Sequence, residues 1–191
     1  MKHRAWAIVL LLLLSACTFS RVIPYYRPAG SGAVAVDDRQ MPRTLQYVFG
    51  TGSALAVSTE RKSKKTEITF MLHLRDTARF AANSGYILFE CDGRTAPLPA
   101  PTWRELKVKK GAASAVEHAW ADVLDASDVP AEFRASMTLR ECKDLPFSFT
   151  LPSVRVGETE HAFGSVSMTP QMMPLTWTLP VPSRVEGSPG D

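Results

Sequence analysis

TEITFMLHLR, residues Thr66 to Arg75, is the stretch that decides the fold of this 191-residue chain. Apolar side chains recur at every second position in it, at Ile68, Phe70, Leu72 and Leu74. Successive side chains of a β-strand point to opposite faces of a sheet, so this period of two predicts a strand with one face in the core.

Runs of similar character surround this strand and are separated by Gly and Pro. They cover residues 45–49, 54–59, 86–91, 103–109, 136–142, 147–151, 162–168 and 175–181. We expect Pro97, Pro99 and Pro101 to prevent regular pairing between two of these runs, with 103–109 resuming as an edge strand. Many short strands at such spacing predict a mainly β fold, an antiparallel β-sandwich that is immunoglobulin-like or similar.

One segment, residues 114–125, is predicted to form a short helix. Ser114 to Glu117 matches a capping box, and Val116, Ala119, Trp120 and Val123 then fall on one helical face. A strand with Ala119, Ala121 and Val123 on one side is the alternative.

The first sixteen residues have the layout of a secretory signal. Basic residues 2–4 (KHR) are followed by the apolar run 6–14 (WAIVLLLLL) and by the small residues Ser15 and Ala16. The competing interpretation is a transmembrane anchor, but the apolar run is shorter than the ~20 residues that cross a bilayer.

The four residues Leu14-Ser15-Ala16-Cys17 resemble the lipobox of bacterial lipoprotein precursors. The resemblance implies that the leader is removed before Cys17 and that Cys17 then carries S-diacylglycerol and N-acyl groups, a covalent lipid in place of any cofactor. Several acyl chains anchor a protein stably where one does not. Thr18, in place of the Asp that favours the inner membrane in that family, indicates the outer membrane. An ordinary secreted protein with a chance Cys here is the alternative.

The remaining chain divides by composition. Residues 17–43, with three Pro and two Gly, are predicted to be a lipidated flexible tether. Residues 44–181 are predicted to form a single β-rich domain, and 182–191 a disordered tail. Without Lys2 and Arg4, the 22 Lys and Arg fall to 20 against 19 Asp and Glu, a net charge of +1. This near-neutral charge gives no sequence-wide case for binding nucleic acid.

Cys91 and Cys142 form an even pair once Cys17 is acylated. Both stand near the ends of expected strands, where neighbouring strands can bring them together. In an oxidising compartment they predict a structural disulfide. Free buried thiols and a redox site are the alternatives, the second weakened because the chain has no Cys-x-x-Cys.

The search for catalytic motifs is negative: no P-loop, Gly-x-Ser-x-Gly, Ser-x-x-Lys or His-Glu-x-x-His sequence is present, and we assign no catalytic residue. One cluster suits Cu(I), because thioether and imidazole are its preferred ligands. It comprises His161, Met168, Met172 and Met173. Apolar packing is the competing role for these methionines.

The strongest charge run is Arg61 to Lys65 (RKSKK), between two expected strands. It predicts a solvated hairpin tip, with contact to anionic lipid headgroups as the sharper hypothesis. Together these features predict a non-enzymatic binding or assembly module, lipid-anchored at the periplasmic side of the outer membrane, with an envelope protein as partner. A periplasmic copper carrier is the alternative.

Overall fold

The structure of the chain, a computed structural model, describes residues 18–36, 41–50, 52–62, 65–75, 78–106, 116–126, 130–140, 142 and 144–178. The leader, Cys17 and the expected tail 182–191 therefore lie outside the described residues. The chain divides into two compact units. The smaller holds the first part of β1 and the last part of β16, and the larger, Pro24–Gln171, holds the rest.

Strands are the only regular elements among the described residues, and every described pairing is antiparallel. They form three sheets. The first contains, in spatial order, β1 (Thr18–Ala29), β16 (Ser165–Thr178), β13 (Phe147–Thr150), β7 (Tyr86–Cys91) and β8 (Arg94–Pro99). The second contains β10 (Glu117–His118), β9 (Trp103–Glu105), β12 (Ala131–Leu139), β5 (Lys65–Leu74), β4 (Ala54–Lys62), β3 (Thr44–Val48) and β2 (Ala33–Ala35). The third contains β11 (Leu124–Asp125), β6 (Arg79–Ala82), β14 (Val154–Val156) and β15 (Thr159–His161).

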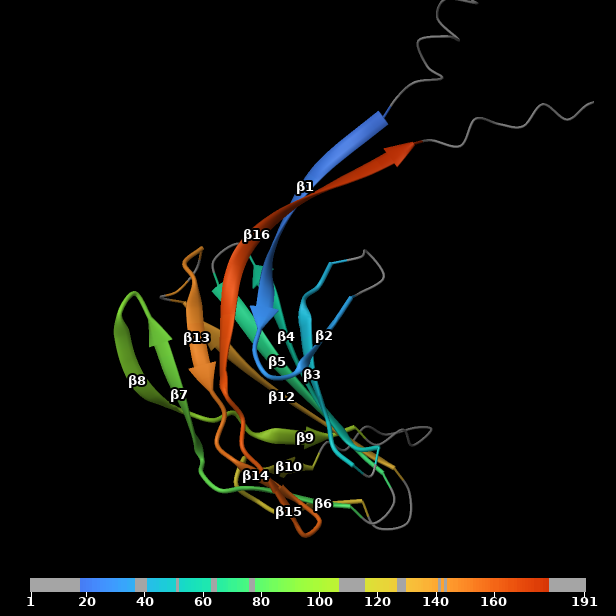
Figure 1. The fold of residues 1–191 in the computed structure, drawn as a ribbon, viewed down its shortest axis with the longest axis vertical. Helices are drawn as coiled ribbons and strands as arrows, with labels where there is room; N and C mark the ends of the chain where they lie inside the picture. Colours follow the sequence, from blue (N-terminus) through green and yellow to red (C-terminus); the bar gives the residue numbers. More distant parts are fainter. Residues whose placement is uncertain are drawn as a thin grey trace, which may run out of the picture. The chain divides into compact units, whose positions relative to one another are not determined.

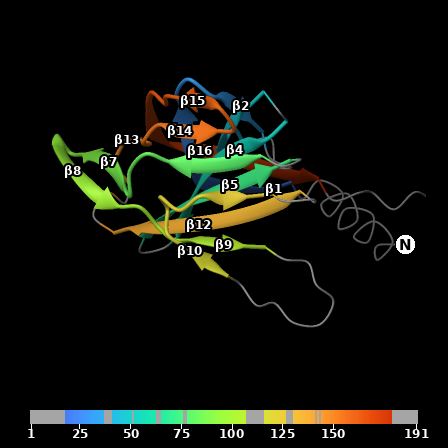
Figure 2. The same cartoon turned by 90° about the horizontal axis from the view of Figure 1, so that it is seen from below.

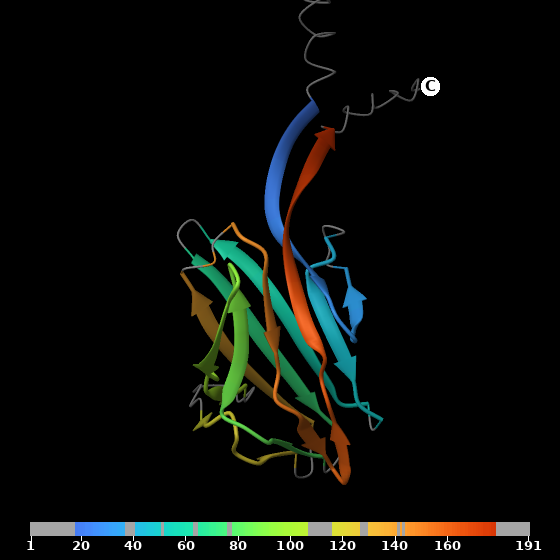
Figure 3. The same ribbon diagram turned by 60° about the vertical axis from the view of Figure 1, so that its left-hand side comes forward.

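The predicted strand at residues 66–75 is confirmed as β5, the middle of the seven-stranded sheet. It pairs with β4 on one side and β12 on the other, and these three strands run side by side in Figure 3, in teal and brown. Its apolar series is buried and the alternate positions are partly exposed. Each fully buried Phe, Leu or Ile contributes about 1.5–3 kcal/mol of transfer free energy, which is why this strand dominates the core.

The five-stranded and seven-stranded sheets share one core, so the arrangement is sandwich-like. Phe70 of β5 packs edge-on against Phe149 of β13, with ring centroids 6.3 Å apart. In Figure 1, β7 and β13 lie in front of β5 and β12. The all-β antiparallel class predicted from the sequence is therefore confirmed.

The helix expected near residues 114–125 is not seen. The described part of this segment forms β10 and β11, joined by a turn at Ala119–Asp122. Asp122 accepts a hydrogen bond from the Ala119 backbone N–H at 2.7 Å and donates its own N–H to the Ala119 carbonyl at 3.1 Å. Trp120 is buried and stacks on Trp103 at 4.5 Å. Local turn bonding and tertiary packing of Trp120 therefore override the helical period.

Residues 17–43 were expected to be a flexible tether, but their described part contains two strands. Thr18–Ala29 forms β1 and Ala33–Ala35 forms β2, which pairs with β3. The side chains of Tyr26 and Met41 are fully buried. The core therefore begins before residue 44, because these apolar side chains find partners that the Pro and Gly content did not indicate.

The proline run does not prevent pairing. Pro97 and Pro99 lie in β8, opposite Leu88 and Tyr86 of β7. β8 is the last strand of its sheet, and a proline is tolerated on an edge strand when its missing N–H faces away from the neighbour. The 103–109 run, expected at an edge, instead contributes β9 between β10 and β12.

Candidate binding cleft at the disulfide margin

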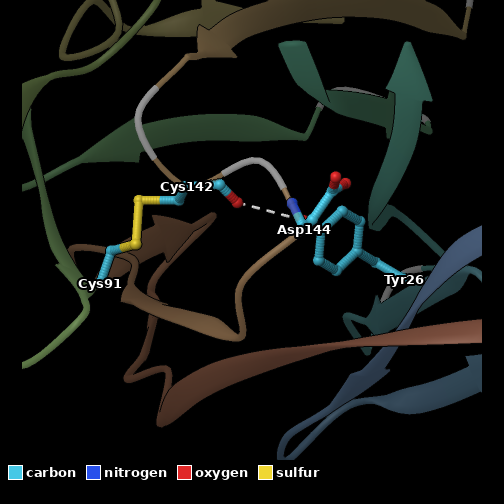
Figure 4. The surroundings of a disulfide bond; sticks show 4 residues. All are labelled: Tyr26, Cys91, Cys142 and Asp144. Carbon is cyan, nitrogen blue, oxygen red and sulfur yellow. Dashed lines mark hydrogen bonds between the residues drawn. A yellow bond between two sulfur atoms is a disulfide. The ribbon is translucent and has the colours of Figure 1, made fainter. Parts of the chain in front are cut away.

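The structure joins Cys91 and Cys142 in a disulfide, with the two Cα atoms 6.2 Å apart (Figure 4). Cys91 is the last residue of β7, and Cys142 lies three residues after the end of β12. The sequence suggested that the two strands are neighbours. The structure places them in different sheets instead. The bond therefore links the two layers of the domain at one margin.

Tyr26 of β1 fixes the loop on the Cys142 side of this bond. Its hydroxyl donates to the Cys142 carbonyl at 3.1 Å and accepts the Asp144 backbone N–H at 2.9 Å. Its ring packs edge-on against Phe147 at 5.1 Å. Figure 4 shows Tyr26 reaching this loop beside the disulfide. Tyr26 thus connects β1 to the loop that carries Cys142.

A cleft of about 780 Å³ opens next to the disulfide, between β8 and the end of β12. Its apolar lining includes Phe89, Leu98 and Leu139, of which Leu98 is only partly buried. Ala96 is in register with the buried Phe89 of β7, and residues in register point to the same face of a sheet. Ala96 and Leu98 therefore lie on the inward face of β8. Ala96 is nevertheless exposed. The cleft is therefore a part of the domain interior that nothing described covers.

The charged groups around this cleft are mainly basic. Lys65, Arg94 and Arg140 line it, against one described acid, Asp92. Within the described part of the chain, neither Arg94 nor Arg140 makes an ion pair. An apolar hollow with cations at its mouth suits a ligand that is apolar in the middle and carries a carboxylate or another anionic group.

The basic run lies at the predicted hairpin, since Lys62 and Lys65 pair across the β4–β5 turn. Its charges are partly neutralised. Arg61 pairs with Asp144, and the Lys62 ammonium lies 2.5 Å from a carboxylate oxygen of Glu67. Hydrogen bonding from Lys62 holds the pKa of Glu67 below its ordinary value, and the same bond raises the pKa of Lys62. These pairs weaken the case for this tip as an anionic-lipid contact.

The expected copper ligands lie in different surroundings. The His161 ring, on β15, packs against Phe49 at 4.9 Å. Met168 of β16 is fully buried and in register with Phe147. Met172 and Met173 are further along β16, and Met172 is exposed. Apolar packing, the competing role, thus describes Met168, and copper binding stays a prediction that no contact of these residues supports.

Among the described residues, no group of three or more His, Cys, Asp or Glu side chains is arranged to hold a metal ion. His73 lies on the partly exposed face of β5, 3.5 Å from a Glu132 carboxylate oxygen. His118 packs edge-on against Phe133, with ring centroids 6.0 Å apart.

Comparison of the chain with protein families, with curated proteins and with solved structures found no match. In the described part of the chain, no helix is long and apolar enough to cross a membrane. The cleft therefore has to be interpreted from its own residues.

Sequence reasoning did not identify this cleft. Arg94, Leu98 and Arg140 lie in three places along the sequence, and only the packing of β8 over the end of β12 brings them together. One signal was present: Pro97 and Pro99 mark an edge strand, and an edge strand with inward apolar residues is a place where a sheet can be left uncovered.

Proposed function

We propose that this chain is a lipid-anchored lipoprotein of a bacterial envelope, held at the periplasmic face of the outer membrane through acylated Cys17. Its β-domain acts as a non-enzymatic binding or assembly module for another envelope protein. The sequence Leu14-Ser15-Ala16-Cys17, after a basic segment and a short apolar run, is the observation that carries this proposal.

The disulfide supports the compartment. Cys91 and Cys142 lie at bonding distance, and such bonds persist in the bacterial periplasm but are rare in the cytosol. A near-neutral β-sandwich that keeps an apolar cleft with a basic mouth suits binding better than catalysis. An immunoglobulin-like strand order within that sandwich remains a prediction.

Metabolic labelling with an alkyne-tagged fatty acid tests the anchor. The wild-type protein should take up the label and fractionate with outer-membrane density, whereas Cys17→Ser should be unlabelled. Ser15→Ala is a matched control, because it keeps a small residue in the lipobox and leaves the acylated cysteine in place. Label that persists on Cys17→Ser would overturn the proposal.

A further inference from the structure

Where β12 borders the cleft, its backbone edge away from β5 has no partner among the described residues. The Leu106 N–H donates to the Glu132 carbonyl at 2.8 Å, so Glu132 directs its backbone groups toward β9. Backbone direction alternates along a strand, so Arg134, Ser136 and Thr138 direct theirs to the same side. The described register of β9 with β12 covers Phe133 and Arg134 only. Ser136 and Thr138 have register partners in β5, Thr69 and Glu67, but on the side of β12 away from β5 no described residue pairs with them.

The opposite wall of the cleft, β8, has a blocked edge. The Ala100 N–H donates to the Gly85 carbonyl at 2.8 Å, which sets the alternation along β8. Even-numbered residues of β8 direct their backbone groups toward β7, so Pro97 and Pro99 stand on the outer edge. Neither proline has an N–H to donate, which opposes the addition of a strand there. Of the two edges at the cleft, only that of β12 can accept one.

A strand added to β12 would continue the line of β9 and lie opposite β8 (Figure 2). Alternate side chains of that strand would point inward, onto the partly buried Leu98 and the exposed Ala96. Those side chains would cover Leu98 and Ala96, which no described residue of this chain encloses. An extended polypeptide would therefore both pair with the β12 edge and cover the inward face of β8.

The charge of the cleft indicates which polypeptide. Arg94, Arg140 and Lys65 surround its mouth, so a segment that carries acidic residues is favoured. The same charges disfavour a second copy of this chain, because pairing β12 with its counterpart would bring two sets of cations together. An acyl chain with an anionic headgroup would satisfy the pocket and the cations but would leave the β12 edge unpaired.

We propose that the Ser136–Leu139 edge of β12 receives an extended, acidic segment of the partner protein, which joins the seven-stranded sheet by β-strand addition and fills the cleft. This inference rests on the proposed role as a binding module, and it names the mode of binding and the chemistry of the partner. It does not depend on the lipid.

Fluorescence anisotropy with the full chain, purified from membranes in detergent, tests this inference. The probes are short labelled peptides that alternate Thr with Val, Leu or Phe and carry a Glu at each end. We expect at least one to bind. N-methylation of the backbone amides that would face β12, or Lys in place of Glu, should each weaken binding by at least about tenfold.

Matched variants locate the binding. Thr138→Pro removes one edge N–H and should abolish binding, whereas Thr138→Val keeps the backbone and should retain it. Arg140→Glu should weaken binding by about tenfold, whereas Arg155→Glu, an exposed change on β14, should have no effect. Near-UV circular dichroism identifies any variant that fails to fold. If Thr138→Pro does not fold, two other measurements still test the inference: the affinity of the Arg140→Glu variant and the affinity of the N-methylated peptide.

Three results would overturn the inference. They are no binding of any probe up to about 1 mM, equal binding of N-methylated and unmodified peptide, and binding to phosphatidylglycerol vesicles but not to peptide. Failure of fatty-acid labelling at Cys17 would instead count against the anchor alone, so the two proposals fail separately.

Discussion

β5 and β8 both have apolar side chains on their inward face, but only β5 is enclosed. β5 is paired over nine residues with each of two neighbours, and its inward side chains are buried. β8 is paired on one side only, and its inward residues Ala96 and Leu98 keep contact with solvent. The difference separates two tasks. We expect the buried side chains of the centre to contribute more to stability than the partly buried side chains of the margin, which leaves the inward face of β8 open to a ligand.

The largest expected effect is at the centre. Phe70→Ala removes a fully buried ring that packs on Trp120 and Phe149, so it should lower the free energy of unfolding by about 3–5 kcal/mol. Leu98→Ala at the margin should cost about 1 kcal/mol, because that side chain is only partly buried. Urea denaturation of both variants, with the disulfide intact, measures the contrast. Equal losses would remove the distinction between centre and margin.

Loss of the disulfide should be the next largest effect, since this bond holds the open margin together. Its cysteines are separated by 51 residues, and a loop of that length stabilises the folded state by ~4 kcal/mol in the chain-entropy model. Cys91→Ser and Cys142→Ser should lower the melting temperature by similar amounts, because either one opens the same loop. Thiols that alkylate in the native, unreduced protein would show that the bond is not formed.

Tyr26→Phe should have a smaller effect at the same margin. The change removes the hydroxyl that bonds the Cys142 carbonyl and the Asp144 N–H, at a cost of about 1–2 kcal/mol. Tyr86→Phe is the matched control, because Tyr86 is 59% exposed and its loss should change stability by less than about 0.5 kcal/mol. A Tyr26→Phe protein as stable as the control would mean that β1 does not hold the disulfide loop.

The smallest expected effect concerns the partly exposed β4–β5 hairpin, and it depends on pH. The lowered pKa of Glu67 means that its carboxylate adds stability above its ordinary pKa of 4.5 and loses it as pH falls through the lower folded-state pKa. Wild type should therefore exceed Glu67→Gln in stability near neutral pH and lose that advantage in acid. Lys62→Gln should remove the same increment. A difference between wild type and Glu67→Gln that stays constant from neutral to acid pH would contradict the assignment.

The contrast between centre and margin also shows what the sequence can predict. The alternation in residues 66–75 is local and strong, so β5 and the all-β class could be derived from it. The cysteine pair could be derived from position and compartment. Residues 18–36 could not be placed in strands, because their partners in the sheets are nine to thirteen residues away or at the far end of the chain and their Pro and Gly content resembles a linker.

The same reasoning explains the two other differences. The helix expected near 114–125 fails because the burial of Trp120 against Trp103 depends on contacts that the local pattern does not contain. The cleft was missed because it lies where no described strand continues β9 along β12, and the lack of a neighbouring strand leaves no pattern in the sequence of β12 itself. Only the prolines of β8 gave a local sign of an edge.

Amide hydrogen exchange along β12 tests the open margin most directly. Ala135, Met137 and Leu139 direct their N–H groups toward β5 and should exchange slowly, as should Arg134, which faces β9. Ser136 and Thr138 should exchange orders of magnitude faster, so protection should alternate residue by residue toward the disulfide end of the strand. Uniform slow exchange from Arg134 to Leu139 would mean that the β12 edge is already paired, and it would contradict the account.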